Sequence, residues 1–184
     1  ALAILERSLE PGHPNLGTVH NNLGLVAQTL GNFPEAREHF EQVLAIFERT
    51  LEPGHPNLGM AHNSLGMLAQ TLGNFSEARE HFEQVLAIWE RSLEPGHPNL
   101  GSAHNNLGEV ERALGHFPEA REHLEQALAI WGRTLEPSHP DLGLAHNNLG
   151  LVDQSLGHFP EAREHLEQAL AILERSLEPG HPNL

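Results

Sequence analysis

The sequence predicts an all-α solenoid of antiparallel helix pairs, and two observations lead to this fold class. The segment Glu10–Gly17 (EPGHPNLG) returns almost unchanged at Glu52, Glu94 and Glu136, so the chain repeats itself every 42 residues. Within a repeat the apolar residues recur at steps of three and four, which is the spacing of one face of a helix. A repeat of this kind indicates structural units that bury their apolar faces against their neighbours in a row.

Each repeat is predicted to begin with a helix. In the first repeat this helix covers about residues 14–30. Its apolar stripe consists of Leu16, Val19, Leu23, Val26 and Leu30. Pro14 stands at the first turn, where its missing N–H is harmless, and Gly31 supplies the left-handed residue that commonly ends a helix. Gly24 makes the helix about 1 kcal/mol less stable than alanine would. We therefore expect the second helix to approach closely at Gly24.

The second helix is predicted at about residues 34–50. Glu35 and Glu38 lie in its first turn, where the helix dipole favours negative charge. The apolar stripe that identifies this helix consists of Ala36, Phe40, Val43, Leu44, Phe47 and Leu51.

The same register divides the whole chain, which we expect to form a single solenoid over 1–184. Residues 1–16 are identical to residues 169–184, so the larger unit is four repeats and the chain is expected to be a slice of a longer array. The predicted parts are half of a second helix at 1–9, repeats at 10–51, 52–93, 94–135 and 136–177, and the start of a fifth repeat at 178–184.

The composition limits the classes of partner. The chain has 25 acidic residues, 10 arginines and no lysine, and its net charge of −15 disfavours nucleic acid and anionic membranes. Cysteine is absent, which excludes disulfides and thiolate metal sites. This slice shows no signal peptide and no apolar run of the roughly 20 residues that cross a bilayer, so a cytoplasmic location is expected.

The spacing of several residues resembles that of a known family. Four successive copies of the pattern cover essentially the whole chain, and they resemble the tetratricopeptide repeat (TPR). The length of 42 residues and the Asn-Asn-Leu-Gly and His-Pro elements look like the subclass found in kinesin light chains. His20 departs from the family pattern, which often has tryptophan there, and Ala27 departs where tyrosine is common. In the first repeat the matching residues are Leu23-Gly24, Gly31, Phe33, Ala36, Phe40 and Val43-Leu44.

The resemblance implies a right-handed superhelix whose concave face is lined by the first helices and binds an extended or helical peptide. The chain would then be a non-catalytic protein–protein interaction scaffold. Asn21, Asn63, Asn105 and Asn147 would form a ladder of amides that donate to and accept from a peptide backbone. The full set of expected groove residues is Asn21, Asn22, Leu25, Gln28, Asn63, Ser64, Met67, Gln70, Asn105, Asn106, Glu109, Arg112, Asn147, Asn148, Leu151 and Gln154.

The chemistry of these positions suggests a neutral to basic protein or peptide partner with an apolar stretch. Glu109 and Arg112 add charge to the second half of the expected groove, and Glu111 and Asp153 are further candidates there. The alternative interpretation of all these positions is a solvated helix face. Its asparagines would persist only because the repeats are copies of one another, with solvent or neighbouring helices satisfying the amides.

A second candidate role is structural. Leu2, Ile4, Leu5 and Leu184 belong to incomplete elements at the two ends, and such ends fit each other head to tail. A contact of that type does not close on itself, so the array would stack into a continuous superhelix or filament.

Neither catalysis nor metal or cofactor binding is predicted. Almost every polar residue occurs four times, whereas a catalytic site needs an asymmetric constellation. Glu35 and His39 lie one helical turn apart, and this pair recurs in every repeat, but two ligands do not make a structural zinc site. We expect His39 and its copies to lie on the exposed face of the second helix.

Histidines elsewhere in the repeat have different expected roles. His20, His62, His104 and His146 are expected to be half-buried between the two helices, so protonation should loosen the array. His13 and its copies precede a proline and are expected to shape the turn between repeats.

Overall fold

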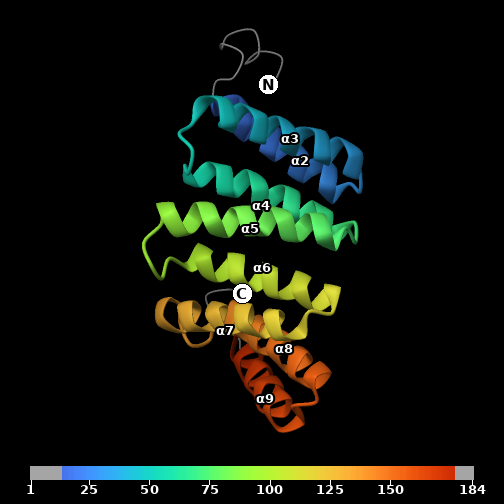
Figure 1. Ribbon diagram of the computed structural model, residues 1–184, viewed down its shortest axis with the longest axis vertical. Coiled ribbons are helices and arrows are strands. Elements are labelled where there is room, and N and C mark those ends of the chain that lie inside the picture. Colours follow the sequence, from blue (N-terminus) through green and yellow to red (C-terminus); the bar gives the residue numbers. More distant parts are fainter. Residues whose placement is uncertain (1–13, 177–184) are drawn as a thin grey trace. The chain divides into compact units, whose positions relative to one another are not determined.

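The computed structural model describes residues 14–176, and all the regular secondary structure in that range is helical (Figure 1). The fold is therefore all-α, as predicted. The helices are α2 (Pro14–Thr29), α3 (Phe33–Thr50), α4 (Pro56–Thr71), α5 (Phe75–Ser92), α6 (Pro98–Leu114), α7 (Phe117–Thr134), α8 (Pro140–Leu156) and α9 (Phe159–Ser176).

The helix boundaries agree with the predicted 14–30 and 34–50 to within one residue in the first repeat. Proline occupies the first position of α4, α6 and α8, and the histidine before it is the N-cap. The ring nitrogen Nδ1 of His55, His97 or His139 accepts a hydrogen bond from the backbone N–H two residues later, at 3.1–3.2 Å. The prediction that these histidines shape the turn is confirmed; His13 lies outside the described residues.

Glycine ends the first helix of each pair, as the sequence predicted for Gly31. This residue has a φ of +76°, and its copy Gly115 has a φ of +84°, values in the left-handed region that favours glycine. The short turn that results brings the second helix back antiparallel to the first.

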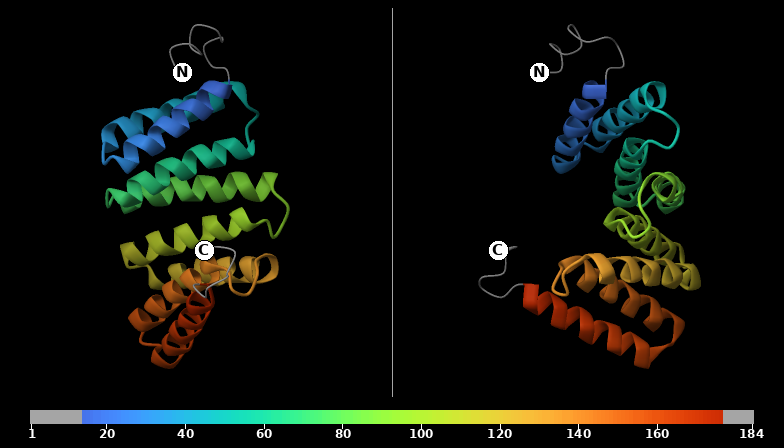
Figure 2. Two further views of the ribbon diagram at one scale, coloured as in Figure 1. Left: turned by 180° about the vertical axis from the view of Figure 1, so that it is seen from behind. Right: turned by 90° about the vertical axis from the view of Figure 1, so that its left-hand side faces the viewer.

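By its internal contacts the chain divides into two compact units, Ala1–Leu93 and Glu94–Leu184. In the first unit α2 packs against α3, α4 packs against α5, and α3 also packs against α4. In the second unit α6–α7 and α8–α9 are the pairs, and α7 packs against α8. Figure 2 shows the antiparallel pairs of each unit from two further directions.

The core of each unit lies between successive helices. In the first unit one cluster joins Leu16, Phe47 and Leu58, and a second joins Ala36, Phe40 and Leu68. The second unit repeats both layers, with Trp131 and Leu124 at the centres of its clusters. These side chains come from the predicted apolar stripes.

Small residues allow the two helices of a pair to approach closely. A Cβ atom on Gly66 would lie 2.7 Å from the ring of Phe82, which confirms the close approach predicted from Gly24 and its copies. A second glycine row, which the sequence analysis did not single out, accommodates the large aromatic residues. Gly59 and Gly101 contact the indole rings of Trp89 and Trp131.

Candidate functional site

The first helices of the first unit carry exposed apolar side chains beside amides. Leu25 on α2 and Met60 and Met67 on α4 are 47%, 56% and 48% exposed. Asn22 is exposed, and the other expected groove residues of this unit are partly exposed: Asn21, Gln28, Asn63, Ser64 and Gln70. The unit therefore presents apolar and amide groups together on residues expected to line a groove.

Asn21 and Ser64 show how these amides are used within the protein. The Ser64 hydroxyl donates to Oδ1 of Asn21 at 3.2 Å, which links α2 to α4. Asn63 donates through Nδ2 to the sulfur of Met67 at 3.4 Å. Beside these contacts lies a cavity of about 110 Å³, lined by Thr18, Asn21, Phe47, Asn57 and Met60 among others. A side chain entering this cavity would meet both polar and apolar groups.

The second unit places a charged network at the equivalent positions. Nδ2 of Asn148 donates to Oδ1 of Asn105 at 3.3 Å and to Oε1 of Glu109 at 2.9 Å. Nδ2 of Asn105 also donates to Glu109, at 3.1 Å. Asn105 and Asn148 are only 8% exposed. Contacts between neighbouring repeats therefore already use part of the amide capacity of the expected ladder.

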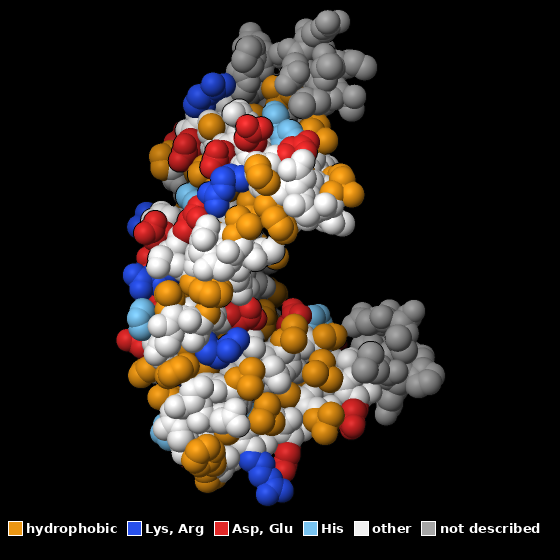
Figure 3. Space-filling view, turned by 90° about the vertical axis from the view of Figure 1, so that its right-hand side faces the viewer, with side chains coloured by type: hydrophobic (Ala, Val, Ile, Leu, Met, Phe, Trp, Pro, Cys, Tyr) orange, Lys and Arg blue, Asp and Glu red, His pale blue; other side chains and the backbone are white. Residues whose placement is uncertain are grey.

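The remaining expected residues of this unit are more accessible. Asn106, Arg112, Asn147 and Leu151 are half-buried, Gln154 is exposed, and Leu144 is 51% exposed. In Figure 3 hydrophobic side chains are exposed on both units beside surface formed by backbone and uncharged side chains. The combination of apolar and polar surface recurs, although the residues that provide it differ.

Two acids expected as groove candidates are buried instead. Glu111 is 6% exposed and Asp153 is 0% exposed. Glu111 contacts Nδ1 of His116 at 2.6 Å, and Asp153 lies 3.3 Å from Nε of Arg121 and 3.6 Å from Nδ1 of His158. The expectation for Glu111 and Asp153 was therefore wrong, because their position belongs to the buried stripe of the first helix.

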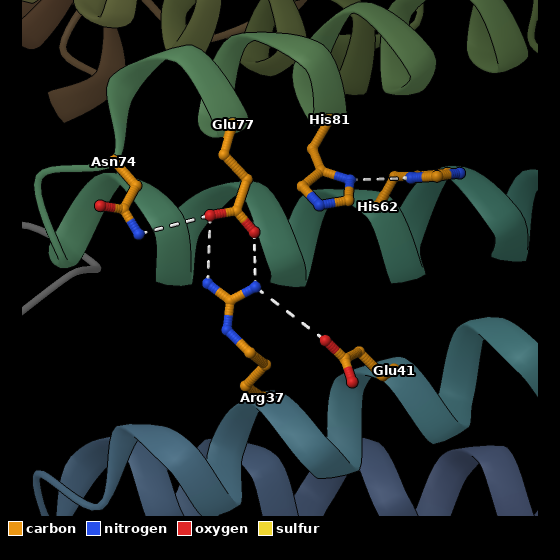
Figure 4. Close-up of polar contacts among 6 residues, drawn as sticks. All are labelled: Arg37, Glu41, His62, Asn74, Glu77 and His81. Carbon is orange, nitrogen blue, oxygen red and sulfur yellow. Dashed lines mark hydrogen bonds and ion pairs between the residues drawn. The ribbon is translucent and has the colours of Figure 1, made fainter.

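A different ion pair joins the repeats of the first unit. Nη1 and Nη2 of Arg37 on α3 donate to the two carboxylate oxygens of Glu77 on α5, at 2.5 and 3.1 Å (Figure 4). This hydrogen bond lowers the pKa of Glu77 and raises that of Arg37. Both side chains are about one-third exposed, so the pair is only partly shielded from water.

Each repeat also contains a pair of facing histidines. Nδ1 of the histidine on the first helix lies 3.0–3.1 Å from Nδ1 of a histidine on the second helix. The pairs are His20–His39, His62–His81, His104–His123 and His146–His165. His39 and its copies are half-buried, so the expectation that they lie on the exposed face was wrong. Their position borders the apolar stripe, next to Phe40, and faces the other helix.

The first-helix histidines are half-buried, as predicted, and their environment disfavours the charged form. Burial first, and then the neighbouring His81, lower the pKa of His62 to about 4. Burial and His123 lower the pKa of His104 to about 4 in the same way. Burial, followed by His165, also lowers the pKa of His146. Among residues 14–176, no group of three or more His, Cys, Asp or Glu side chains is arranged to hold a metal ion.

One face of α9 is open. Phe159, Leu166 and Leu170 are 66%, 36% and 59% exposed, and they border a cavity of about 370 Å³. Their equivalents in the third repeat pack against α8. The end-to-end residues expected from the sequence, Leu2, Ile4, Leu5 and Leu184, lie outside the described residues. None of the helices in the described range is sufficiently long and apolar to span a bilayer.

Comparisons with known proteins agree with this geometry. The sequence matches the family model described as tetratricopeptide repeat over residues 1–49, 16–91, 57–131 and 100–175. No curated protein matches the sequence.

The structure is similar to several solved proteins. One crystal structure, of a Podosopora anserina protein described as kinesin light chain with nearly identical TPR-like repeats, is 34% identical with a TM-score of 0.78. The match covers 97% of this chain and 84% of that one. BtubC (BKLC) from P. vanneervenii is 24% identical with a TM-score of 0.84, covering 97% and 71%. Aspartyl phosphate phosphatase F from Bacillus subtilis is 15% identical with a TM-score of 0.81, covering 97% and 45%. The last two likenesses concern the fold alone.

Proposed function

We propose that this chain, which belongs to the tetratricopeptide repeat family, is a non-catalytic scaffold that binds a peptide or helical segment along the first helices of its repeats. The observation that carries this proposal is the row of exposed apolar side chains on α2 and α4, Leu25, Met60 and Met67, beside partly exposed amides. Methionine adapts its shape to different apolar partners, which suits a surface that accepts a peptide.

The size of the apolar contribution is sufficient for a specific contact. Burying a fully exposed side chain of this kind is worth roughly 1.5–3 kcal/mol, and because these three are about half exposed, covering each contributes roughly half of that. Three of them in one unit offset part of the entropy lost on binding. Hydrogen bonds from the amides would then fix the direction of the peptide.

Charge selects among possible peptides. With a net charge of −15, the chain attracts basic partners, does not repel neutral ones and repels acidic ones. In the second unit the Glu109 side chain accepts two amide hydrogen bonds, and a basic residue of a peptide bound to this unit is expected to lie near its carboxylate. The proposed ligand is therefore a peptide with an apolar stretch and at least one basic residue.

The test is selection of peptides from a random library, followed by fluorescence anisotropy with the selected peptide. Met67→Glu, Asn63→Ala and Asn147→Ala should each weaken binding by about tenfold or more if the first helices form the contact. Gln84→Ala, on the exposed surface of α5, is the matched control and should leave the affinity unchanged. Equal affinities for all four variants would contradict this location of the site.

A second candidate function is end-to-end association of two copies, and the open face of α9 favours it. Phe159, Leu166 and Leu170 occupy the positions that Phe117, Leu124 and Leu128 occupy on α7, where these side chains pack against α8. The first helix of a second copy offers a corresponding surface. Val26 and Leu30 on α2 are 57% and 78% exposed. We propose that α9 of one copy holds α2 of the next in the way that α7 holds α8.

Light scattering coupled to size-exclusion chromatography over a concentration series tests this second candidate. The mass should rise in multiples of one chain, and Leu170→Glu should return it to one chain. Leu144→Glu places the same charge on an exposed leucine of α8 and should leave the association intact. A constant mass of one chain at every concentration would rule out the association and leave peptide binding unaffected.

A further inference from the structure

The histidine pairs have the geometry of hydrogen bonds between two imidazole rings. The ring centroids lie 5.2–5.4 Å apart and the planes are tilted by 34–50°. This centroid distance is the Nδ1–Nδ1 distance of 3.0–3.1 Å plus about one ring radius at each end. The two nitrogens therefore point straight at each other across the gap between the helices.

Such head-on geometry excludes a chelate. A metal ion bound by both rings would need two lone pairs that converge on a point beside the line between the nitrogens. Here the lone pair of one Nδ1 points at the other Nδ1. The contact therefore requires one ring to carry a proton on Nδ1 and the other ring to accept a hydrogen bond from it. Each pair thus contains one Nδ1–H ring and one Nε2–H ring when it is neutral.

Several charged groups face the His62–His81 pair. Glu77 and Glu80 on α5 and Glu41 on α3 favour a proton on His81, whereas Arg37 on α3 disfavours it. Arg37 also donates to both carboxylate oxygens of Glu77 (Figure 4). The carboxylate of Glu77 is therefore already paired with a cation. Burial is the largest influence on both rings and lowers the pKa of each.

The surroundings of the other pairs differ in detail. Nε2 of His39 lies 4.0 Å from Glu35 on its own helix. Nε2 of His165 lies 3.8 Å from Asp153 on α8, which also contacts Arg121 on α7 and His158 on α9. For His104 and His146, burial is the largest influence, followed by the charge of the paired histidine. The facing nitrogen is the feature common to all four pairs.

We propose that the four histidine pairs form a proton-operated latch between the two helices of every repeat, which acid opens. A neutral pair, or a pair with one added proton, keeps its N–H···N bond. When both rings are protonated, no acceptor remains, and two N–H groups and two positive charges face each other at about 3 Å. The helices must then separate, or the rings must turn out to solvent.

Because one latch recurs in each repeat, acid is expected to loosen every repeat. The facing nitrogens are the same in every repeat, whereas the charged neighbours differ, so each latch responds to acid with its own midpoint. Neither a peptide ligand nor a second copy of the chain is needed for this response, so it can be measured on the chain alone in buffer.

The first test is nuclear magnetic resonance of the whole chain with ¹⁵N-labelled histidine at pH 8. One ring of every pair should be the Nδ1–H tautomer, which is a distinctive assignment because the N-cap histidines use Nδ1 as an acceptor. The proposal is overturned if all eight paired rings are Nε2–H tautomers. This measurement requires no substitution, so it remains decisive even if the variants below fail to fold.

The second test compares thermal unfolding at pH 7.5 and pH 5. A variant with His39→Gln, His81→Gln, His123→Gln and His165→Gln should show a measurably smaller acid-induced drop in midpoint, because the repulsion between two protonated rings is removed while the burial of the first-helix histidines remains. The control replaces the N-caps, with His55→Asn, His97→Asn and His139→Asn, and should keep most of the drop. An unchanged drop in the first variant, or its loss in the control, would refute the latch.

Discussion

Gly101 and Gly132 lie in the same repeat, and replacing each by alanine should change stability in opposite directions. Gly101 on α6 contacts the indole of Trp131, whose Nε1–H donates to the carbonyl oxygen of Pro98 at 3.0 Å. A Cβ atom there would collide with the indole. Overpacking costs about 1–3 kcal/mol, and loss of the indole hydrogen bond adds about 1 kcal/mol. The better helix propensity of alanine returns about 1 kcal/mol, so Gly101→Ala should destabilise the protein by about 1–3 kcal/mol.

Gly132 lies in a different environment near the end of α7. No atom stands within 4 Å of the position that its Cβ would occupy, and the residue is exposed. The equivalent positions in the other repeats carry Glu48, Glu90 and Glu174, so a side chain fits there. Gly132→Ala should therefore stabilise the protein by about 0.5–1 kcal/mol through helix propensity and a less flexible unfolded chain.

Urea unfolding followed by circular dichroism measures both effects. The midpoint should fall for Gly101→Ala and rise for Gly132→Ala, with unchanged slopes, because neither variant alters the surface exposed on unfolding. Thermal midpoints should move by about 2–4 °C for each kcal/mol. A rise in the midpoint of Gly101→Ala would refute the tight contact between Gly101 and Trp131, and a fall in the midpoint of Gly132→Ala would refute the open surroundings of Gly132.

Two further predictions concern charge. Between pH 6.5 and about 4 the unfolded chain binds more protons than the folded one, because the pKa values of His62 and His104 fall to about 4 on folding. The free energy of unfolding should therefore decrease as the pH falls through this range. At pH 5.5 the decrease for the two residues together should be about 1.5 kcal/mol, a value reduced because both side chains are partly exposed to water. A thermal melt with the same midpoint at pH 7.5 and pH 5.5 would contradict this. Arg121→Ala should destabilise the protein by about 3 kcal/mol, because it leaves the buried carboxylate of Asp153 without its arginine. Arg163→Ala, in the next repeat, removes an exposed side chain that bonds Glu167 and should leave the urea midpoint unchanged.

The sequence predicted the helices well because their boundaries depend on local chemistry. Proline at the first position and glycine in the left-handed turn fix both ends of α6 without any long-range contact. The close approach of the helices could also be predicted, since a glycine inside a helix is costly unless something packs against it.

Side-chain partners across the fold could not be predicted in the same way. His39 borders the apolar stripe, and only the packing of α2 on α3 shows that it faces His20. A constant separation of 19 residues between the paired histidines of every repeat is a signal that could have suggested the pairing. Asn21 likewise accepts a hydrogen bond from Ser64. Ser64 is the residue after Asn63, which is the ladder position of the next repeat.

The acids of the later repeats show a limit of reasoning from repeat variation. Ala27 and Ala69 become Glu111 and Asp153 in the third and fourth copies, which looked like variation on an exposed surface. The position is buried in every repeat, and the acid is tolerated because His116 or His158 replaces asparagine at the start of the following helix. The acid and the histidine five residues after it are therefore coupled substitutions, because the histidine is the partner of the buried acid.

The buried carboxylate of Asp153 restricts how such modules can be rearranged. Its arginine partner, Arg121, belongs to the preceding repeat. A repeat with alanine at this position needs no ion-pair partner in the repeat before it. If gene duplication or shuffling moved the fourth module to a place with no helix before it, a carboxylate would be buried without its cation. Alanine modules can thus open an array, and aspartate modules can only extend one, so nearly identical copies are not interchangeable in order.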